Sequence, residues 1–322
     1  MSTAEATQGT VSAFDEGTNT VCIGTTESGA TLYVGNASKK WAIGDVPHTL
    51  KENPAFSLSY KKGYVIALVT DAALRHFENK HQHDPVALNC FYMHKTSLGP
   101  FVVSIKNLKT SKKGYCLVQA SLLQAEGAPL LTRADQFQPD RYKEKVHVVF
   151  TMGNLDSEEG INFMHEPYQA PNRAAMTPFK HIYMGEYLEC LADRSTFGKD
   201  HLSMGKPEFH QSLQFKDGRD IDFKSIPYFC DLFVTPPMLL GWDYLGGPVW
   251  CPTMQLEVLF KRRPSGKEIL SSIVAPHIIN GRFDCSGGIW DPQGNLIALT
   301  RHQCLVVPWS RNSKGEKPRP RF

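Results

Sequence analysis

The run Thr253-Met-Gln-Leu-Glu-Val-Leu-Phe260 is followed, after a gap, by Gly287-Gly-Ile-Trp-Asp-Pro-Gln-Gly294 and then by Asn295-Leu-Ile-Ala-Leu-Thr-Arg-His-Gln-Cys-Leu305. The first and last stretches are rich in the apolar residues that favour strands. The segment Asp291-Pro-Gln-Gly294 between them has the Pro and Gly that are typical of a hairpin turn. The last third of the chain is therefore predicted to be a sheet of long antiparallel strands.

Polar residues interrupt this apolar pattern at three places. Thr253 and Gln303 fall inside strands that otherwise look buried, and Asp231 falls inside the helix-like run Ile226-Pro-Tyr-Phe-Cys-Asp-Leu-Phe-Val234. A buried polar group without a partner costs several kcal/mol, and a buried charge costs more. We therefore expect these three side chains to meet in the folded protein.

The same three features resemble a known family. A helix with an embedded Asp, a strand that opens Pro-Thr-x-x-Leu and a final strand with an embedded Gln are similar to the acyl-CoA thioesterase II, or TesB-like, double-hotdog proteins. The resemblance covers roughly residues 35–150 and 205–310. It implies that Asp231, Thr253 and Gln303 hold and activate the hydrolytic water, with an acyl-CoA or another acyl thioester as the substrate and without a cofactor or metal. It also implies a homo-oligomer.

The chain repeats one plan in two halves, each with a helix near its start and a run of strands after it. Such strands have one apolar face, and a mostly apolar helix is its natural partner. We predict an α+β fold, a double hotdog in which each unit wraps a long antiparallel sheet around a central helix. The predicted helices are 63–77 and a region near 223–240, and the predicted strands are 41–45, 87–94, 101–109, 114–123, 146–152, 209–215, 252–262, 268–279, 282–291 and 296–308.

The predicted boundaries follow from this repeat. Two units in one chain can pair their sheets edge to edge, which removes two edge strands that would otherwise invite aggregation. The connector is long for a segment without structure, so we expect it to pack as a lid or over a sheet face. The expected segments are a disordered N-terminal segment (1–30), an N-terminal hotdog (31–152), a connector (153–208), a C-terminal hotdog (209–310) and a basic flexible tail (311–322).

Composition excludes several other classes of protein. The chain has 322 residues and a net charge of +3, which is too small to indicate nucleic-acid binding. It has no apolar run of the ~18–20 residues that a membrane span requires, and its first twenty residues lack an apolar core typical of a secretion signal. The eight cysteines form no C-x-x-C pair, which argues against zinc and thioredoxin-like sites. We therefore expect free thiols and a cytoplasmic location.

A second group of residues is predicted to contact substrate. His83 and Asp84 precede a strand, and in the resembled family a similar segment lies beside the substrate groove; their spacing is poor for a closed metal site. Gly63 and Tyr64 begin the first helix, along which the acyl chain would lie. These four are the expected substrate-binding residues, and no Gly-rich phosphate loop or G-x-S-x-G elbow suggests a nucleotide-binding protein or an α/β-hydrolase.

Other interpretations of the same residues remain open. Asp231 could cap a short helix before Pro236-Pro237, Thr253 could be an ordinary strand residue, and Gln303 could bind a backbone group across the sheet. The alternative functions are a hotdog dehydratase or cyclase that acts on a polyketide-like intermediate, and an acyl-binding protein without catalysis. Fold alone does not decide between these reactions.

Overall fold

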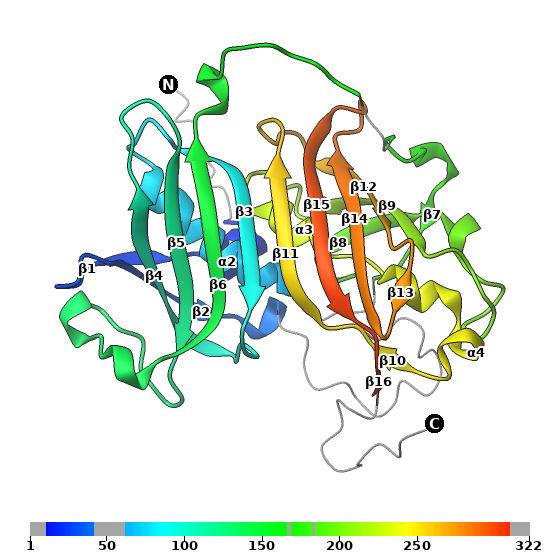
Figure 1. Cartoon of the computed structure of the whole chain (residues 1–322), viewed down its shortest axis with the longest axis horizontal. Helices are drawn as coiled ribbons and strands as arrows, with labels where there is room; N and C mark the ends of the chain where they lie inside the picture. Colours follow the sequence, from blue (N-terminus) through cyan, green and yellow to red (C-terminus); the bar gives the residue numbers. More distant parts are fainter. Residues whose placement is uncertain (1–10, 42–61, 166–168, 182–183, 310–322) are drawn as a thin grey trace, which may run out of the picture.

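The computed structural model describes residues 11–41, 62–165, 169–181 and 184–309. Within this part of the chain, two antiparallel units lie side by side (Figure 1). In the same ranges, no helix is both long enough and apolar enough to cross a membrane.

The first unit is a sheet around one long helix. It contains the 16-residue helix α2 (Lys62–Phe77), as predicted, and the short helix α1 (Ala13–Thr18). Its strands are β1 (Val21–Thr25), β2 (Thr31–Ala37), β3 (Asp84–Tyr92), β4 (Gly99–Lys109), β5 (Cys116–Gln124) and β6 (Lys143–Gly153).

The second unit has the same plan with a much shorter helix. Its helices are α3 (Ser225–Cys230) and α4 (Trp242–Leu245). Its strands are β7 (Thr177–Pro178), β8 (Leu188–Ala192), β9 (Glu208–Phe215), β11 (Thr253–Phe260), β12 (Glu268–Val274), β13 (Ile278–Ile279), β14 (Arg282–Trp290) and β15 (Leu296–Leu305), with a separate pair β10 (Val249–Trp250) and β16 (Val307–Pro308). The 3-10 helices of both units and the connector are η1 (Lys39–Trp41), η4 (Ala134–Gln136), η5 (Pro139–Arg141), η6 (Leu155–Ser157), η7 (Arg173–Ala175), η8 (Arg194–Thr196) and η9 (Pro236–Leu240).

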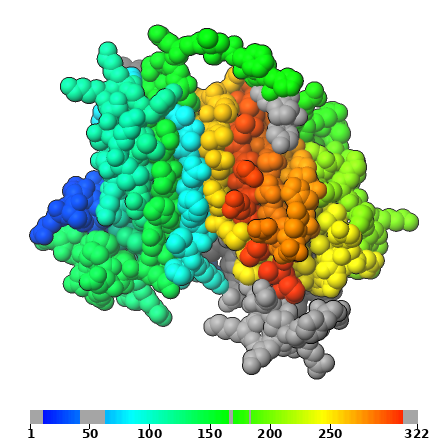
Figure 2. All heavy atoms as spheres, viewed as in Figure 1, coloured from blue at the N-terminus to red at the C-terminus, as the bar shows by residue number. Residues whose placement is uncertain are grey.

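One continuous sheet joins the two units. Its strand order is β1-β2-β4-β5-β6-β3-β11-β15-β14-β12-β9-β8-β7, and β3 pairs antiparallel with β11, so that Leu88 lies opposite Val258. Figure 2 shows β3 and β11 in contact along the outer face of the sheet. Because the units pair edge to edge, neither β3 nor β11 is exposed as an edge strand. Two such units, each with a sheet packed on a helix, confirm the predicted double hotdog.

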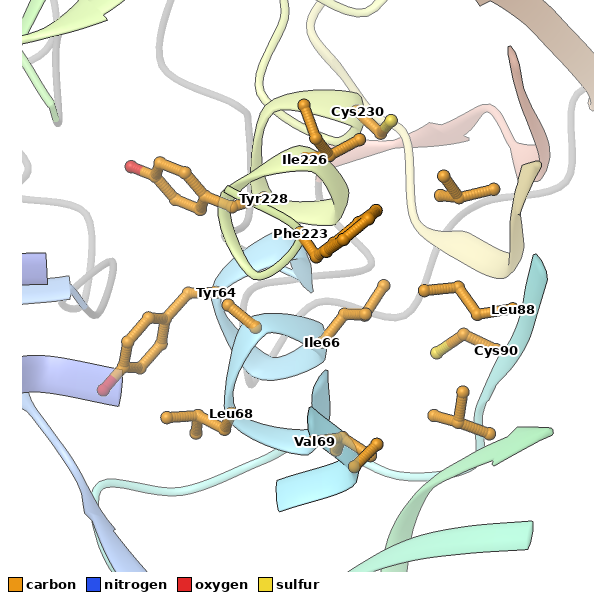
Figure 3. Close-up of a cluster of buried hydrophobic side chains, with 14 of the residues drawn as sticks. Tyr64, Ile66, Leu68, Val69, Leu88, Cys90, Phe223, Ile226, Tyr228 and Cys230 are labelled. Atoms are coloured by element: carbon orange, nitrogen blue, oxygen red, sulfur yellow. The ribbon is translucent and has the colours of Figure 1, made fainter. Parts of the chain in front are cut away.

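The two helices share a core beneath this sheet. Figure 3 shows Ile66 of α2 directed toward Leu88 and Cys90 of β3, with α3 packed beside α2. All of these apolar side chains are fully buried. A helix that is apolar on most of its surface must be enclosed, and α2 is enclosed by the sheet on one side and by α3 on another.

Two predicted helical and strand segments differ from the structure. A single helix cannot run from 223 to 240, because Pro236 and Pro237 lack backbone N–H groups; α3 ends at Cys230, and only a 3-10 helix follows. Trp41 closes η1, and the rest of the expected strand 41–45 lies outside the described residues.

The predicted segment boundaries also need correction. Part of the segment expected to be disordered, 1–30, is ordered: α1 and β1 lie within it, and the Phe14 side chain is fully buried against Trp41. The last part of the expected connector, 153–208, includes β8, which pairs with β9 and therefore belongs to the second unit. The expected tail, 311–322, lies outside the described residues.

Candidate active site

Asp231 is a buried carboxylate of the second unit that accepts a hydrogen bond from the first unit. It follows α3 directly as its C-terminal cap, and it is 7% exposed. Its Oδ2 atom accepts a hydrogen bond of 2.6 Å from the backbone N–H of Gly63. Gly63 is the second residue of α2, where N–H groups have no partner within the helix and the helix dipole favours negative charge. The first unit therefore stabilises the ionised side chain of the second.

Gly63 permits this contact because it has no side chain. A Cβ atom at this position would lie 2.7 Å from the carbonyl oxygen of Tyr228 and 3.0 Å from Cβ of Asp231. Both contacts are with backbone or near-backbone atoms of α3 and its cap, which cannot swing aside. The close approach of α2 to α3, and with it the hydrogen bond to Asp231, depends on glycine.

A β-bulge directs Thr253 toward the inner face of the sheet, which is the face that covers the helices. Thr253 pairs with Cys304, whereas Gln255 pairs with Gln303, so Met254 is an extra residue in β11. Residues opposite each other in a sheet point to the same face, and an inserted residue reverses the alternation beyond it. Thr253 therefore shares the inner face with Cys304, whose Sγ lies 3.7 Å from Oγ1 of Thr253.

Gln303 does not join these residues. Along β15 the side chains of Thr300, His302 and Cys304 are buried, whereas Arg301 and Gln303 are exposed. Because side chains alternate along a strand, Gln303 points to the outer face, away from the helices. The expectation that Gln303 meets Asp231 is therefore wrong by one residue. Arg301 is the signal in the sequence that could have shown this, since a residue two positions from an exposed arginine shares its face.

His302 takes the inner position beside Asp231. Its side chain is fully buried, and its Nδ1 atom lies 3.8 Å from Oδ1 of Asp231. On its other side, Nε2 lies 3.2 Å from Oγ1 of Thr300. The ring packs edge to face on Phe233, with the ring centroids 5.2 Å apart. Sequence reasoning missed this residue because it placed the functional amide one position further on.

Comparison with known proteins places the fold in a family. The profile described as the acyl-CoA thioesterase N-terminal domain matches residues 63–137, and the one described as the acyl-CoA thioesterase C-terminal domain matches residues 167–306. Together they cover more than half of the chain. The chain belongs to the acyl-CoA thioesterase family. This confirms the resemblance inferred from the helix and strand motifs.

Solved structures show the same fold at low sequence identity. The chain is similar to a hot dog fold protein of unknown function from Alicyclobacillus acidocaldarius, with a TM-score of 0.69 and 18% identity over 92% of this chain and 98% of that one. It is also similar to an acyl-CoA thioesterase II, TesB2, from Mycobacterium marinum, with a TM-score of 0.60 and 13% identity over 92% and 98% of the two chains. No curated protein matches the chain.

Two buried cysteines flank His302 in this family member. Donor atoms of Cys285, His302 and Cys304 all lie within 4.8 Å of one another, and zinc binds such sulfur and nitrogen donors. In the absence of a metal, burial raises the pKa of the Cys285 thiol well above its ordinary value, so that thiol is neutral. A neutral thiol packs as a small apolar side chain beside the imidazole.

Tyr92 of β3 borders the same region. Burial raises the pKa of its phenol well above the usual value, and the negative charge of Asp231 raises it further. The phenol therefore stays neutral beside the carboxylate. Tyr92 therefore adds no negative charge beside Asp231.

His83 and Asp84 lie far from Asp231. They stand at the start of β3, whereas Tyr92, whose phenol feels the charge of Asp231, ends that strand. Nine residues of strand span about 25–30 Å. Asp84 is 1% exposed, and its Oδ2 accepts hydrogen bonds of 2.9 Å from both Arg263 and the backbone N–H of Leu155. The structure gives Asp84 a role in joining the two units, since Arg263 follows β11.

Tyr64 is also placed in the core. Its side chain is 3% exposed, and Figure 3 shows it directed away from the strands that Ile66 faces. Its hydroxyl donates a hydrogen bond to the carbonyl of Gly17 and accepts one of 3.0 Å from the N–H of Ser38. Of the four residues expected to bind substrate, only Gly63 reaches the carboxylate, and it does so through its backbone.

Proposed function

We propose that this protein hydrolyses acyl thioesters, with an acyl-CoA as the substrate class, by a water molecule activated at Asp231. The observation that carries the proposal is a carboxylate that is 7% exposed yet accepts a 2.6 Å hydrogen bond from the N-terminus of α2. Both domains of the chain match the acyl-CoA thioesterase family. The hydrogen bond from Gly63 stabilises the ionised form of Asp231, which is the form that accepts a proton.

The reaction needs one water and no covalent intermediate. Asp231 accepts a proton from the water as its oxygen bonds to the thioester carbonyl carbon. The tetrahedral intermediate then collapses, the carbon–sulfur bond breaks, and the proton passes from Asp231 to the departing sulfur. The products are a carboxylic acid and a free thiol. Positioned proton transfer of this kind contributes ~10²–10⁴-fold to the rate.

Thr253 supports this site from the neighbouring strand. The bulge in β11 brings its hydroxyl to the inner face, where it lies beside Cys304. A hydroxyl can both donate and accept a hydrogen bond, so Thr253 can orient either the water or the carbonyl of the substrate.

All eight cysteines are free thiols, which agrees with the reducing cytoplasm as the working compartment.

Release of free thiol from a panel of acyl-CoA substrates of different chain length tests the proposal. We expect thiol release by the wild-type protein and a fall in kcat of at least ~10²-fold in Asp231→Asn, with the melting temperature retained. Near-full activity of that variant would remove Asp231 from its role. A dehydrated or cyclised product without thiol release, or binding without turnover, would overturn the hydrolase proposal.

A further inference from the structure

The imidazole of His302 faces Asp231 in a defined protonation pattern. A threonine hydroxyl has a single proton, and that of Thr300 is donated to the carbonyl oxygen of Glu257 at 2.9 Å. Nε2 of His302 lies 3.2 Å from the same hydroxyl oxygen, and it therefore donates its proton to that oxygen. In the neutral ring, Nδ1 is then the acceptor, and it is Nδ1 that lies toward Asp231.

One water can bridge two acceptors that face each other, because it carries two protons. The 3.8 Å between Nδ1 and Oδ1 of Asp231 is too long for a direct hydrogen bond. With a water at the usual ~2.8 Å from both atoms, Nδ1 and Oδ1 would subtend about 85° at its oxygen, an angle that two slightly bent hydrogen bonds allow. Such a water donates one proton to the carboxylate and one to the imidazole. Its lone pairs are left directed away from both, as an attacking nucleophile requires.

We propose that His302, and not Gln303, is the third member of the water-activating site, and that its Nδ1 binds the same water as Asp231. This inference rests on the proposed thioester hydrolysis. It makes the chain a departure from the Asp, Thr and Gln pattern that the family resemblance implies, with an imidazole in place of the carboxamide. The proton still goes to Asp231; the imidazole fixes the direction from which the water attacks.

The strand register supports this assignment independently of the hydrogen bonds. His302 lies opposite Leu256 of β11 and opposite Cys285 of β14, both of which are buried on the inner face. Gln303 lies opposite Gln255 and Asp284 on the outer face. Exchanging the two positions would require a one-residue slip of β15 against both neighbours, which would also bring Arg301 inside.

An imidazole, unlike a carboxamide, gains a proton in the mildly acidic range. The titratable groups that face this region are Asp231 after α3, Tyr92 of β3, Cys285 of β14 and Cys304 and Cys230 beside it. Burial raises the pKa of the Tyr92, Cys230 and Cys285 groups, so these stay neutral. Protonation of His302 places a cation against Asp231 and turns the acceptor Nδ1 into a donor. The positive charge makes Asp231 a weaker base, and the change of Nδ1 from acceptor to donor removes the water's second acceptor.

Three variants test the proposal: His302→Ala, His302→Gln and, as the matched control on the next residue, Gln303→Ala. The readouts are kcat and KM for thiol release, the pH profile of kcat/KM, and the melting temperature. We expect His302→Ala to lose ~10²-fold in kcat with little change in KM, because the water loses its orientation. We expect His302→Gln to recover to within ~10-fold of wild type, since a carboxamide oxygen also accepts from the water. Gln303→Ala should stay within ~2-fold, the range of a surface change.

The pH profile separates a water-binding role from a purely structural one. In His302→Gln the acidic limb should move to lower pH, because the carboxamide takes up no proton. If His302→Ala fails to fold, this shift in the folded His302→Gln variant decides the matter. Wild-type kcat in His302→Ala, a His302→Gln profile that superimposes on wild type, or a Gln303→Ala loss as large as that of His302→Ala would each overturn the proposal while leaving hydrolysis at Asp231 intact. Absence of thiol release by the wild type would overturn both.

Discussion

Gly63 and Asp231 are 168 residues apart in the chain, and the backbone N–H of the first donates a 2.6 Å hydrogen bond to the carboxylate of the second. The contact crosses from α2 of one unit to the end of α3 of the other. A buried carboxylate needs such a partner, because burial without one costs several kcal/mol. The proposed base is therefore complete only when both hotdog units have packed against each other.

A methyl group at position 63 should disturb this contact directly. We expect Gly63→Ala to lower kcat by at least ~10-fold, because its Cβ would lie 2.7 Å from the Tyr228 carbonyl and must push α3 and Asp231 away. Thiol-release kinetics and thermal melting measure the two effects. Gly114→Ala is the control, since a Cβ there would meet only the Ser111 side chain. Equal activity in the two variants would contradict the role of Gly63.

The Asp84–Arg263 pair should contribute to stability and not to turnover. Removing Arg263 leaves a carboxylate that is 1% exposed without one of its charged partners, so we expect Arg263→Ala to lower the free energy of unfolding by about 2 kcal/mol. Urea denaturation measures the loss, and a cycle with Asp84→Ala isolates the pair. The exposed neighbour Arg262 provides the control. A tenfold fall in kcat/KM at unchanged stability would instead indicate that the Asp84–Arg263 pair contributes to substrate binding.

Acid should weaken the packing of α1 onto the second unit. Burial alone would raise the pKa of Asp15, but hydrogen bonds from Arg219 and Lys224 outweigh it and hold that pKa well below its ordinary value. A lowered pKa in the folded state adds stability that is complete above the unfolded value of ~3.9 and is lost as pH falls toward the folded pKa. Wild type should therefore exceed Asp15→Asn in stability at pH 7 and 5, with the difference shrinking below pH 4. A difference that does not depend on pH in urea denaturation would contradict this account.

Chelators should leave the hydrolysis unchanged. The proposed hydrolysis at Asp231 uses no metal, although Cys285, His302 and Cys304 have donors suitable for zinc within 4.8 Å of one another. We expect full activity after dialysis against a strong zinc chelator, and elemental analysis of the purified protein checks for metal at the outset. Stoichiometric zinc whose removal abolishes thiol release would assign these three residues to a metal centre instead.

Local signals predicted the elements whose ends are marked in the sequence. The helix 63–77 corresponds to α2, and the turn Asp291-Pro-Gln-Gly294 joins β14 to β15, with the N–H of Gly294 bonded to the Asp291 carbonyl at 3.0 Å. No local signal in the sequence predicted that Phe14 is ordered and buried. A single aromatic residue in a polar segment shows no periodicity, and its burial depends on Trp41, Phe215 and Tyr228, all distant along the chain.

By itself the sequence determined the two repeated units, the antiparallel strands and the family, because these follow from apolar periodicity, turn residues and short motifs. It also indicated Asp231 and Thr253 as candidate site residues. Tertiary structure alone decided that Gly63 binds the carboxylate and that His302, rather than Gln303, faces it. The reason is physical: the face of a strand residue is set by register against its neighbours, and a shift of a single residue reverses it.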